Sequence, residues 1–193
     1  MFILSELSDL VRIPPSTFNL PTRESIINEL SKKYSNKVVN DLGLAISIWD
    51  VLEIKEGLLK PGDGAAYVET RFRCVIWKPF VGEVLIGWVS DCTPEGIKVK
   101  LDFFDEIFVP KNYLFENCVF REAEKAWVWQ PDEEAELFID INEKIRFRVE
   151  EEIFVNIKPK ANEEDEDNSE RPPSYALLAS CQTDGMGCVT WWE

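Results

Sequence analysis

The chain has 193 residues, 21 basic and 36 acidic side chains, a formal charge of −15 and no histidine. The absence of histidine excludes Ser-His-Asp and Cys-His catalysis, His-ligated metal sites and histidine pH switches. Residues 1–80 hold 10 acids and 10 bases, whereas residues 81–193 hold 26 acids and 11 bases. Because the two parts differ so sharply in charge, the sequence predicts a unit at 1–80 and a unit at 81–193.

Composition also limits the compartment and the class of protein. The hydrophobic content of 45% and the seven tryptophans favour a packed core over global disorder. No apolar run approaches the ~20 residues that a membrane span needs, and the start of the chain lacks the basic flank of a secretory signal. The five cysteines are scattered without a CxxC pair, which favours reduced, mostly buried thiols in the cytosol or nucleus.

The first unit is predicted to combine strands with a single helix. The helix is expected to start with Thr22 as its N-cap and to fray near Asn36, with Ile26 and Leu30 on its apolar face. Pro14 and Pro15 stop the segment before it, and Pro61, Gly62, Asp63 and Gly64 form a turn. The predicted strands are Phe2–Ile13, Leu42–Ile54 and Val68–Trp77.

The second unit is predicted to be all β. Its five short, regularly spaced strands fit a small closed barrel such as an OB-fold. Residues 160–174 are acidic and nearly free of apolar side chains, so we expect a disordered insertion inside this unit. Two segments after it, 175–180 and Gly187–Trp192, are predicted to form a closing hairpin. The predicted barrel strands are Glu83–Ser90, Gly96–Leu101, Glu106–Pro110, Ala126–Gln130 and Lys144–Val155.

The carboxylates do not predict an enzyme. The runs at 132–136 and 150–152 are consecutive, so side chains of one strand cannot converge on one point, and a solvated face is the better interpretation. No EF-hand spacing, HExxH or phosphate-binding loop occurs. We therefore expect no catalytic residue, no metal site and no cofactor.

Alternation along two strands suggests a binding face. Lys98 and Lys100 alternate with apolar residues, as do Arg146 and Arg148. Basic residues on the outside of a barrel, with aromatic side chains nearby, can follow a single-stranded RNA backbone and stack on its bases. Ordinary solvent-side positions in an acidic unit explain the pattern equally well, and the charge of −15 argues against tight non-specific binding. The RNA-contact candidates are Lys98, Lys100, Phe103, Phe104, Arg146 and Arg148.

Two pairs of tryptophans give further expectations. Trp127 and Trp129 lie two residues apart on one strand, so both side chains share a face and core filling is expected. Trp191 and Trp192 are adjacent, so at most one faces inward. The other is expected to cover a domain junction or a partner.

The order of several motifs resembles one family, the stalk subunit shared by eukaryotic and archaeal RNA polymerases. The motifs are Arg73–Phe80, Glu83–Gly87, Pro94–Gly96, Leu101–Ile107 and Trp127–Trp129. Four further segments are most similar to the RNA polymerase III member: Phe2–Pro15, Pro61–Gly64, Glu143–Val149 and Gly185–Trp192. The resemblance covers the chain except for the acidic insertion and the 122–140 region.

The resemblance implies a ribonucleoprotein-like α+β domain followed by an OB barrel of the ribosomal S-one type. It implies a non-catalytic nuclear subunit that forms an obligate heterodimer with a small helical stalk subunit. Such a subunit docks on the polymerase III core, meets initiation factors and nascent RNA, and supports initiation on small untranslated RNA genes. The implied docking residues are Pro14, Pro15, Pro61, Gly62, Asp63 and Gly64.

Two other classes of function stay open at this point. A free-standing OB-fold RNA-binding protein would use the same basic face alone, and tight binding by the isolated chain would favour it. A hydrolase built on carboxylates is the least favoured class, because nothing brings the acids together.

Overall fold

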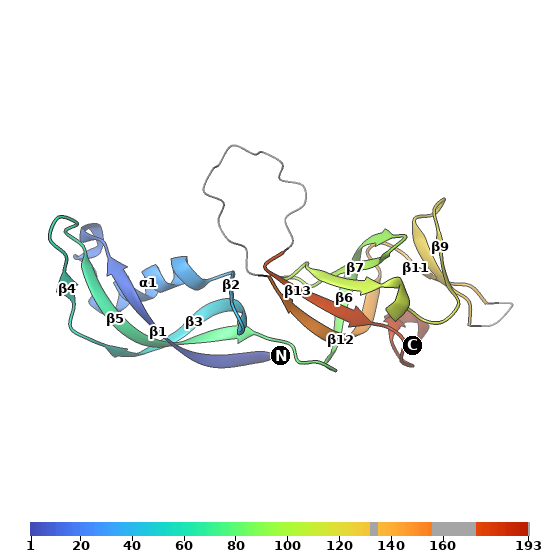
Figure 1. The fold of residues 1–193 in the computed structure, drawn as a ribbon, viewed down its shortest axis with the longest axis horizontal. Coiled ribbons are helices and arrows are strands. Elements are labelled where there is room, and N and C mark those ends of the chain that lie inside the picture. The colour runs from blue at the N-terminus through green and yellow to red at the C-terminus, as the bar shows by residue number, and fades with distance from the viewer. Residues whose placement is uncertain (132–134, 156–172, 193) are drawn as a thin grey trace. The chain divides into compact units, whose positions relative to one another are not determined.

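The computed structural model describes residues 1–131, 135–155 and 173–192. It divides into two compact units, Met1–Lys78 and Pro79–Glu193, each described separately below (Figure 1). The predicted disordered insertion at 160–174 lies outside the described residues, apart from Pro173 and Ser174. Within the part of the chain that is described, no helix is long and apolar enough to cross a membrane.

The first unit is built on an antiparallel sheet with the strand order β1-β5-β3-β2. The two long strands β1 and β5 pair without a register shift from Phe2 opposite Trp77 to Ile13 opposite Ala66. A short strand, β4 (Leu58–Leu59), pairs with the start of β5. The other strands are β1 (Phe2–Ile13), β2 (Lys37–Val39), β3 (Gly43–Ile54) and β5 (Ala66–Trp77). The three predicted strands of this unit are therefore confirmed, with small differences in their ends.

One helix, α1 (Thr22–Tyr34), packs against one face of this sheet (Figure 1). Ile26 and Leu30 are fully buried there in a core with Phe72. The N-cap is Pro21, which makes no side-chain cap hydrogen bond, so the prediction of Thr22 as N-cap is wrong. The single turn η1 (Pro15–Thr17) precedes the helix and fixes the path of the chain into it, because the Pro21 carbonyl accepts the first helical bond from Ser25 N–H.

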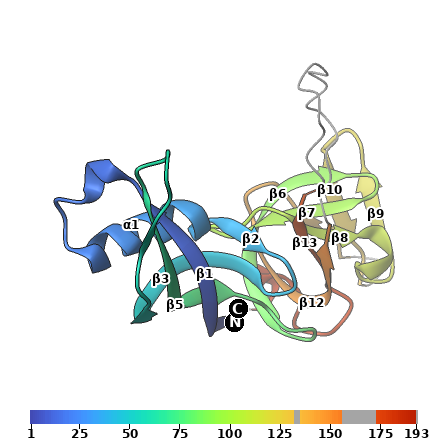
Figure 2. The same cartoon turned by 60° about the vertical axis from the view of Figure 1, so that its left-hand side comes forward.

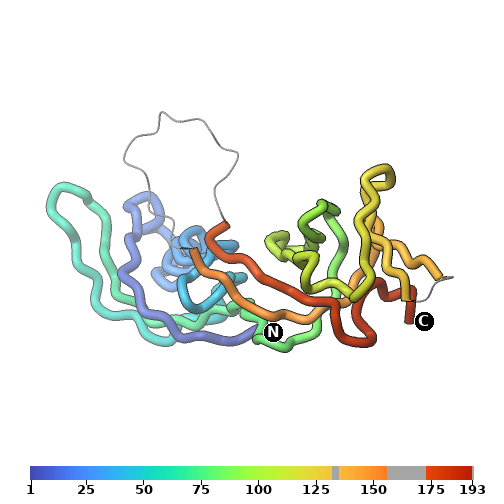
Figure 3. The backbone as a smooth tube through the Cα atoms, turned by 45° about the vertical axis from the view of Figure 1, so that its right-hand side comes forward, coloured from blue at the N-terminus to red at the C-terminus, as the bar shows by residue number. Residues whose placement is uncertain are grey.

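The second unit contains a closed barrel of five strands, as Figures 2 and 3 show from two sides. Its strands follow the order β13-β8-β7-β6-β12, and the circle closes because β13 also pairs with β12. β13 is antiparallel to β12 and parallel to β8. The strands are β6 (Val84–Thr93), β7 (Gly96–Lys100), β8 (Ile107–Pro110), β12 (Lys144–Phe154) and β13 (Tyr175–Ser180). The predicted fold class, an α+β domain followed by an all-β barrel, is confirmed.

Two predictions about this barrel are wrong. The segment Ala126–Gln130 is not a barrel strand: β10 (Ala126–Trp129) is the centre of a separate sheet between β9 (Cys118–Arg121) and β11 (Leu137–Ile139). The last two segments do not form a hairpin with each other. Instead, β13 and the short β14 (Gly187–Cys188) each pair with β12, and Val189–Trp191 is a 3-10 turn, η3. A short turn η2 (Lys111–Tyr113) follows β8.

Candidate functional site

The strand register gathers basic side chains on one outer face of the barrel. β6 lies between β12 and β7, and Trp88 of β6 faces Lys144 of β12 on one side and Lys100 of β7 on the other. Further along, Ile86 faces Arg146 and Val84 faces Arg148. An exposed apolar stripe, Val84, Ile86 and Trp88, therefore lies between two basic rows.

The alternation inferred from the sequence is confirmed on both basic strands. On β7, Ile97 and Val99 are fully buried, while Lys98 and Lys100 are exposed. On β12, Ile145, Phe147 and Val149 are fully buried in the barrel, so the basic side chains between them point outward. This arrangement follows from the two-residue period of a strand, because one face of each strand fills the barrel.

The predicted basic residues differ in how far they are available to a ligand. Lys98 and Lys100 form no ion pair with any residue that the structure describes. Arg146 donates to the carbonyl oxygen of Gly185 at 3.0 Å, so part of its hydrogen-bonding capacity is used inside the unit. Arg148 is neutralised by Glu150, to which its Nε and Nη2 donate at 2.8 and 2.7 Å. The two lysines of β7 are therefore the strongest candidates for phosphate contact.

Lys144 belongs to the same face, although sequence reasoning did not select it. Its Nζ lies 5.3 Å from the centre of the Trp88 ring, a cation–π distance. The signal was present, because Lys144 begins the alternation that continues through Arg146 and Arg148. What the sequence could not supply was the register that brings Lys144 opposite Trp88.

The two predicted phenylalanines have different positions. Phe103 is 42% exposed, whereas Phe104 is only 8% exposed and its ring lies 5.5 Å from that of Tyr175. Phe104 is therefore a core residue of the barrel, and its selection as a base-stacking candidate was wrong. Trp88, 40% exposed between the basic rows, is better placed to stack on a base.

A second candidate site lies at the end of the first unit where β1 stops and β5 starts. Pro14 follows β1 and Pro15 opens η1, while Pro61–Gly64 links β4 to β5. A side chain added at Gly64 would lie 3.7 Å from Pro15 Cγ, so the two predicted docking segments are neighbours. Gly62 and Gly64 have φ of +90° and +69°, which glycine adopts without strain.

A hydrogen-bonded network fixes the Pro61–Gly64 turn to β1. Arg12 donates through Nε and Nη2 to the two carboxylate oxygens of Asp63, at 3.0 and 2.6 Å. The Tyr67 hydroxyl donates to Asp63 at 2.6 Å. These donors, Arg12 foremost, hold the pKa of the Asp63 carboxyl well below its usual range. Asp63 is therefore a structural anchor of the turn rather than a metal ligand.

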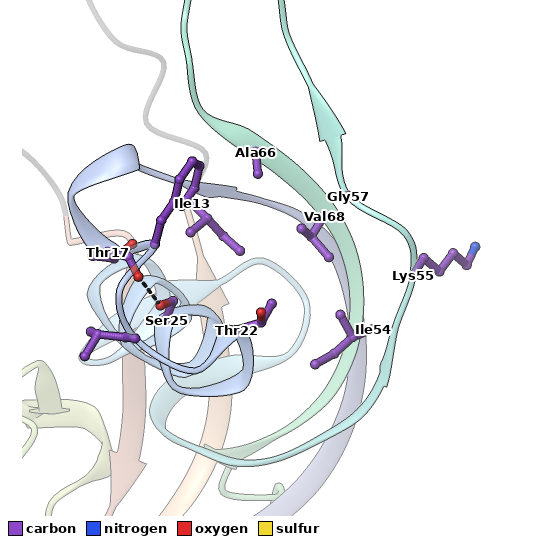
Figure 4. A pocket seen from close by; sticks show the side chains of 11 residues that line it. Ile13, Thr17, Thr22, Ser25, Ile54, Lys55, Gly57, Ala66 and Val68 are labelled. Carbon is purple, nitrogen blue, oxygen red and sulfur yellow. Dashed lines mark hydrogen bonds between the residues drawn. The ribbon is translucent and has the colours of Figure 1, made fainter.

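A pocket of about 300 Å³ opens beside these segments, as Figure 4 shows. Ile13 and Val68 line it with apolar surface, and the Ser25 hydroxyl donates to the carbonyl oxygen of Thr17 at 3.1 Å. Lys55 points away from the pocket and pairs with Glu69. Large exposed apolar side chains cluster at this end of the unit, namely Phe18, Leu20, Ile54, Leu58 and Leu59. Together with the two proline segments, this pocket and its surroundings form what we call the tip.

The remaining chemistry-bearing residues have structural positions. Among the described residues, no group of Cys, Asp and Glu is arranged to hold a metal ion. Burial raises the pKa of the Cys92 and Cys118 thiols to about 11 and that of Cys181 to about 12. The Cys188 thiol donates to Glu143 at 2.8 Å, and burial raises its pKa as well. All five cysteines are free thiols, four of them buried.

The tryptophan pairs agree with expectation in part. Trp127 is 4% exposed and donates from its ring nitrogen to the carbonyl oxygen of Thr93 at 3.0 Å. Trp129 stacks on Phe115 at 4.3 Å, and Trp191 lies 5.4 Å from Trp129. Trp192 is 45% exposed, although its ring nitrogen donates to Met186.

Comparison with known proteins gives a consistent result over both units. A family model described as "RNA polymerase III subunit Rpc25" matches residues 83–192. Residues 8–64 match a model described as "SHS2 domain found in N terminus of Rpb7p/Rpc25p/MJ0397". The confirmed α+β domain is thus of the SHS2 type.

Full-length relatives carry the same description. The chain is 51% identical to "DNA-directed RNA polymerase III subunit RPC8" of Saccharomyces cerevisiae, with 100% of each chain covered. It is 46% identical to the Schizosaccharomyces pombe protein, again over 100% of both chains. It is 39% identical to the Bos taurus protein, over 100% of this chain and 98% of the relative. The chain therefore belongs to the RNA polymerase III subunit Rpc25 family.

Proposed function

We propose that this chain is a non-catalytic stalk subunit of DNA-directed RNA polymerase III in the nucleus. The observation that carries the proposal is end-to-end similarity to three relatives named as subunits of that enzyme. The lack of a metal-holding cluster in the described residues is compatible with catalysis on other chains of the complex. In this role the chain forms a heterodimer with a small helical subunit, contacts initiation factors and supports initiation on small untranslated RNA genes.

Affinity purification of the tagged chain, followed by mass spectrometry, tests this assignment. We expect the large polymerase III subunits and a small helical protein at one copy per tagged chain. Recovery of the chain alone, or with unrelated proteins, would contradict the assignment. Run-off transcription from a polymerase III promoter, with and without the chain, tests the initiation step: without the chain, initiation should fall while elongation on a preformed scaffold is unchanged.

Within this function, the tip docks on the polymerase core. Exposed apolar side chains beside a preformed pocket are typical of a protein-binding surface, and Leu58 and Leu59 are 75% and 68% exposed. The double substitution Leu58→Asp and Leu59→Asp should reduce recovery of the large subunits at least tenfold. Val119→Asp, at a 54% exposed apolar residue of the second unit, is the control and should leave recovery unchanged. Equal recovery with the tip variant would contradict docking through the tip.

The basic face of the barrel contacts emerging single-stranded RNA weakly. Lys98, Lys100 and Lys144 supply positive charge around Trp88, which is the arrangement that follows a backbone and stacks on a base. The charge of −15 limits the affinity, because phosphate binding depends on positive potential. Filter binding of the isolated chain at low and moderate salt separates this auxiliary contact from the alternative function, a free-standing OB-fold RNA-binding protein. Tight binding that persists at moderate salt would favour the alternative.

A further inference from the structure

The strand β1 is the long edge strand of the first unit's sheet. It stands at one end of the order β1-β5-β3-β2 and pairs with β5 along all of its 12 residues. On its other side, no strand of the described residues pairs with it. An edge of this length offers a row of backbone N–H and C=O groups to an additional strand.

The positions of these edge groups follow from one backbone hydrogen bond. Lys78 N–H donates to the Met1 carbonyl at 2.9 Å, and Met1 is opposite Lys78 when the register of Phe2 with Trp77 is continued by one residue. Met1 is thus at a hydrogen-bonded position, and such positions alternate along an antiparallel pair. Odd-numbered residues of β1 therefore bond to β5, and the even-numbered residues from Leu4 to Arg12 direct their backbone groups to the open edge.

The geometry at Leu10 agrees with this assignment. The Leu10 N–H bonds to the side-chain carboxylate of its own neighbour, Asp9, at 2.9 Å instead of to β5. Asp9 is held in place by Lys33 and by the Tyr34 hydroxyl, which donates to it at 3.0 Å. One edge amide is thus already bonded by the protein itself, and the stretch from Leu4 to Ser8 remains for another chain.

This edge lacks the features by which proteins usually prevent strand addition. β1 contains no proline and no lysine, and its pairing with β5 contains no bulge, whereas β3 shifts register against β5 at three places. The charged side chains Glu6 and Arg12 are already neutralised by Arg71 and Asp63. Leu4 and Leu10, on the same face of the strand, are 48% and 57% exposed.

We propose that the β1 edge accepts an extended segment of a neighbouring polymerase subunit as an additional strand of this sheet. The segment bonds to the edge groups of Leu4, Glu6 and Ser8, and apolar side chains at alternate positions cover Leu4 and Leu10. A second copy of this chain is disfavoured as the occupant, because two chains of charge −15 repel each other. The inference rests on the proposed function in that the donor belongs to the polymerase assembly.

Amide hydrogen exchange at single-residue resolution tests the proposal, with the free chain compared to the chain in the purified polymerase. In the free chain, the amides of Leu4, Glu6 and Ser8 should exchange much faster than those of Ser5 and Leu7. In the complex, the even-numbered amides should slow by about tenfold or more, while the odd-numbered ones stay slow in both states. This alternation is specific to strand addition, since a chain that merely covers the face would not distinguish the two sets.

A backbone substitution gives an independent readout. Ser8→Pro removes one edge N–H and leaves the β5 pairing intact, because proline is tolerated at the open side of an edge strand. Ser8→Ala keeps the N–H and is the matched control. We expect Ser8→Pro to abolish the slowing at Leu4 and Glu6 in the complex, whereas Ser8→Ala keeps it. If Ser8→Pro prevents folding, the exchange comparison on the unaltered chain decides alone.

Three outcomes would overturn the proposal. If the chain purifies with the polymerase but Leu4, Glu6 and Ser8 exchange as fast as in the free chain, strand addition is wrong and the subunit assignment stands. If no polymerase subunit is recovered, the proposed function is wrong and the proposed donor is excluded with it. If the even-numbered amides become protected in the free chain as its concentration rises, the occupant is a second copy rather than a neighbouring subunit.

Discussion

The two units carry similar basic patterns on their strands but use them differently. In the first unit, Arg71 and Arg73 alternate along β5 as Lys98 and Lys100 alternate along β7. Arg71 pairs with Glu6 and Glu53 on the two flanking strands, and Arg73 pairs with Asp50. The lysines of β7 have no such partner among the described residues.

This difference shows what strand alternation can and cannot predict. The pattern correctly predicts which side chains point away from the core, because a strand has a period of two residues. Availability depends on the neighbouring strands, which the sequence does not order. In the neutral unit, cross-strand carboxylates neutralise both arginines and hold three strands in register, whereas in the acidic unit the lysines stay open to solvent.

The largest expected effect compares a buried with an exposed tryptophan, one from each unit. Trp127→Ala should lower the free energy of unfolding by about 3–5 kcal/mol, because it leaves a cavity and removes a hydrogen bond to Thr93. Trp49→Ala, at a residue 64% exposed on β3, should change it by less than about 0.5 kcal/mol. Denaturant titration monitored by circular dichroism measures both. A near-neutral Trp127→Ala would place that indole outside the core.

The next effect tests the lysines against the arginines directly. Replacing Lys98 and Lys100 by Gln should weaken RNA binding and reduce the slope of log K against log salt by about 1.4, because each phosphate of a single strand that is no longer neutralised accounts for about 0.7. Replacing Arg71 and Arg73 by Gln removes the same charge and should leave the slope unchanged, since ion pairs already occupy both side chains. Equal slopes for the two double variants would show that net charge alone, rather than this face, determines binding.

A smaller effect concerns the anchored turn of the first unit. The folded-state pKa of Asp63 is depressed, chiefly by the hydrogen bonds from Arg12, so the folded state releases this proton more readily than the unfolded chain. Its stabilisation is therefore complete above the ordinary pKa of aspartate, ~3.9, and is lost as the pH falls towards the depressed folded value. Titration of the Asp63 carboxyl by NMR measures this shift, and Arg12→Gln should move the pKa back towards ~3.9. A normal pKa in the unaltered chain would contradict the network.

The smallest effect is expected at the thiols. Burial raises the pKa of Cys92 and Cys118 to about 11, so both are protonated at neutral pH. At pH 8 their alkylation in the folded chain should be at least ~100-fold slower than in the unfolded chain, because the thiolate is the nucleophile. A thiol whose pKa is raised by folding stabilises the fold below its unfolded pKa, ~8.5, and this contribution is lost as the pH rises towards the folded value. Mass spectrometry after timed alkylation measures the rates, and fast labelling of Cys92 would contradict its burial.

Much of the fold was predictable because single elements have local signals. The strand Phe2–Ile13 was located correctly, since its apolar residues alternate and two prolines follow it. Partnership was harder to predict. The segment Ala126–Trp129 has the composition of a barrel strand, but its neighbours β9 and β11 are short and their pairing depends on distant contacts. The capping role given to Thr22 was wrong because the preceding Pro21 already occupies the helix boundary.

The candidate site was predictable to the same degree. Lys98 and Lys100 could be selected from alternation, whereas the inclusion of Lys144 required the register with Trp88. Phe104 could not be separated from Phe103 by sequence, because the two adjacent rings differ only in which of them packs against Tyr175, a residue far along the chain. The docking, RNA-contact and strand-addition roles stay predictions until the experiments above are done.

The closure of the barrel by β13 has a consequence for the order in which the protein forms. Strand β13 follows β12 in the sequence and lies between β12 and β8 in the barrel, so it is among the last parts of the chain to be synthesised. Until Tyr175–Ser180 has left the ribosome, the edges of β8 and β12 have no strand between them. The first unit, complete at Lys78, can fold while the barrel is still being made. A chain cut short before residue 175 would therefore retain a folded first unit and present two unpaired strand edges, which favour aggregation.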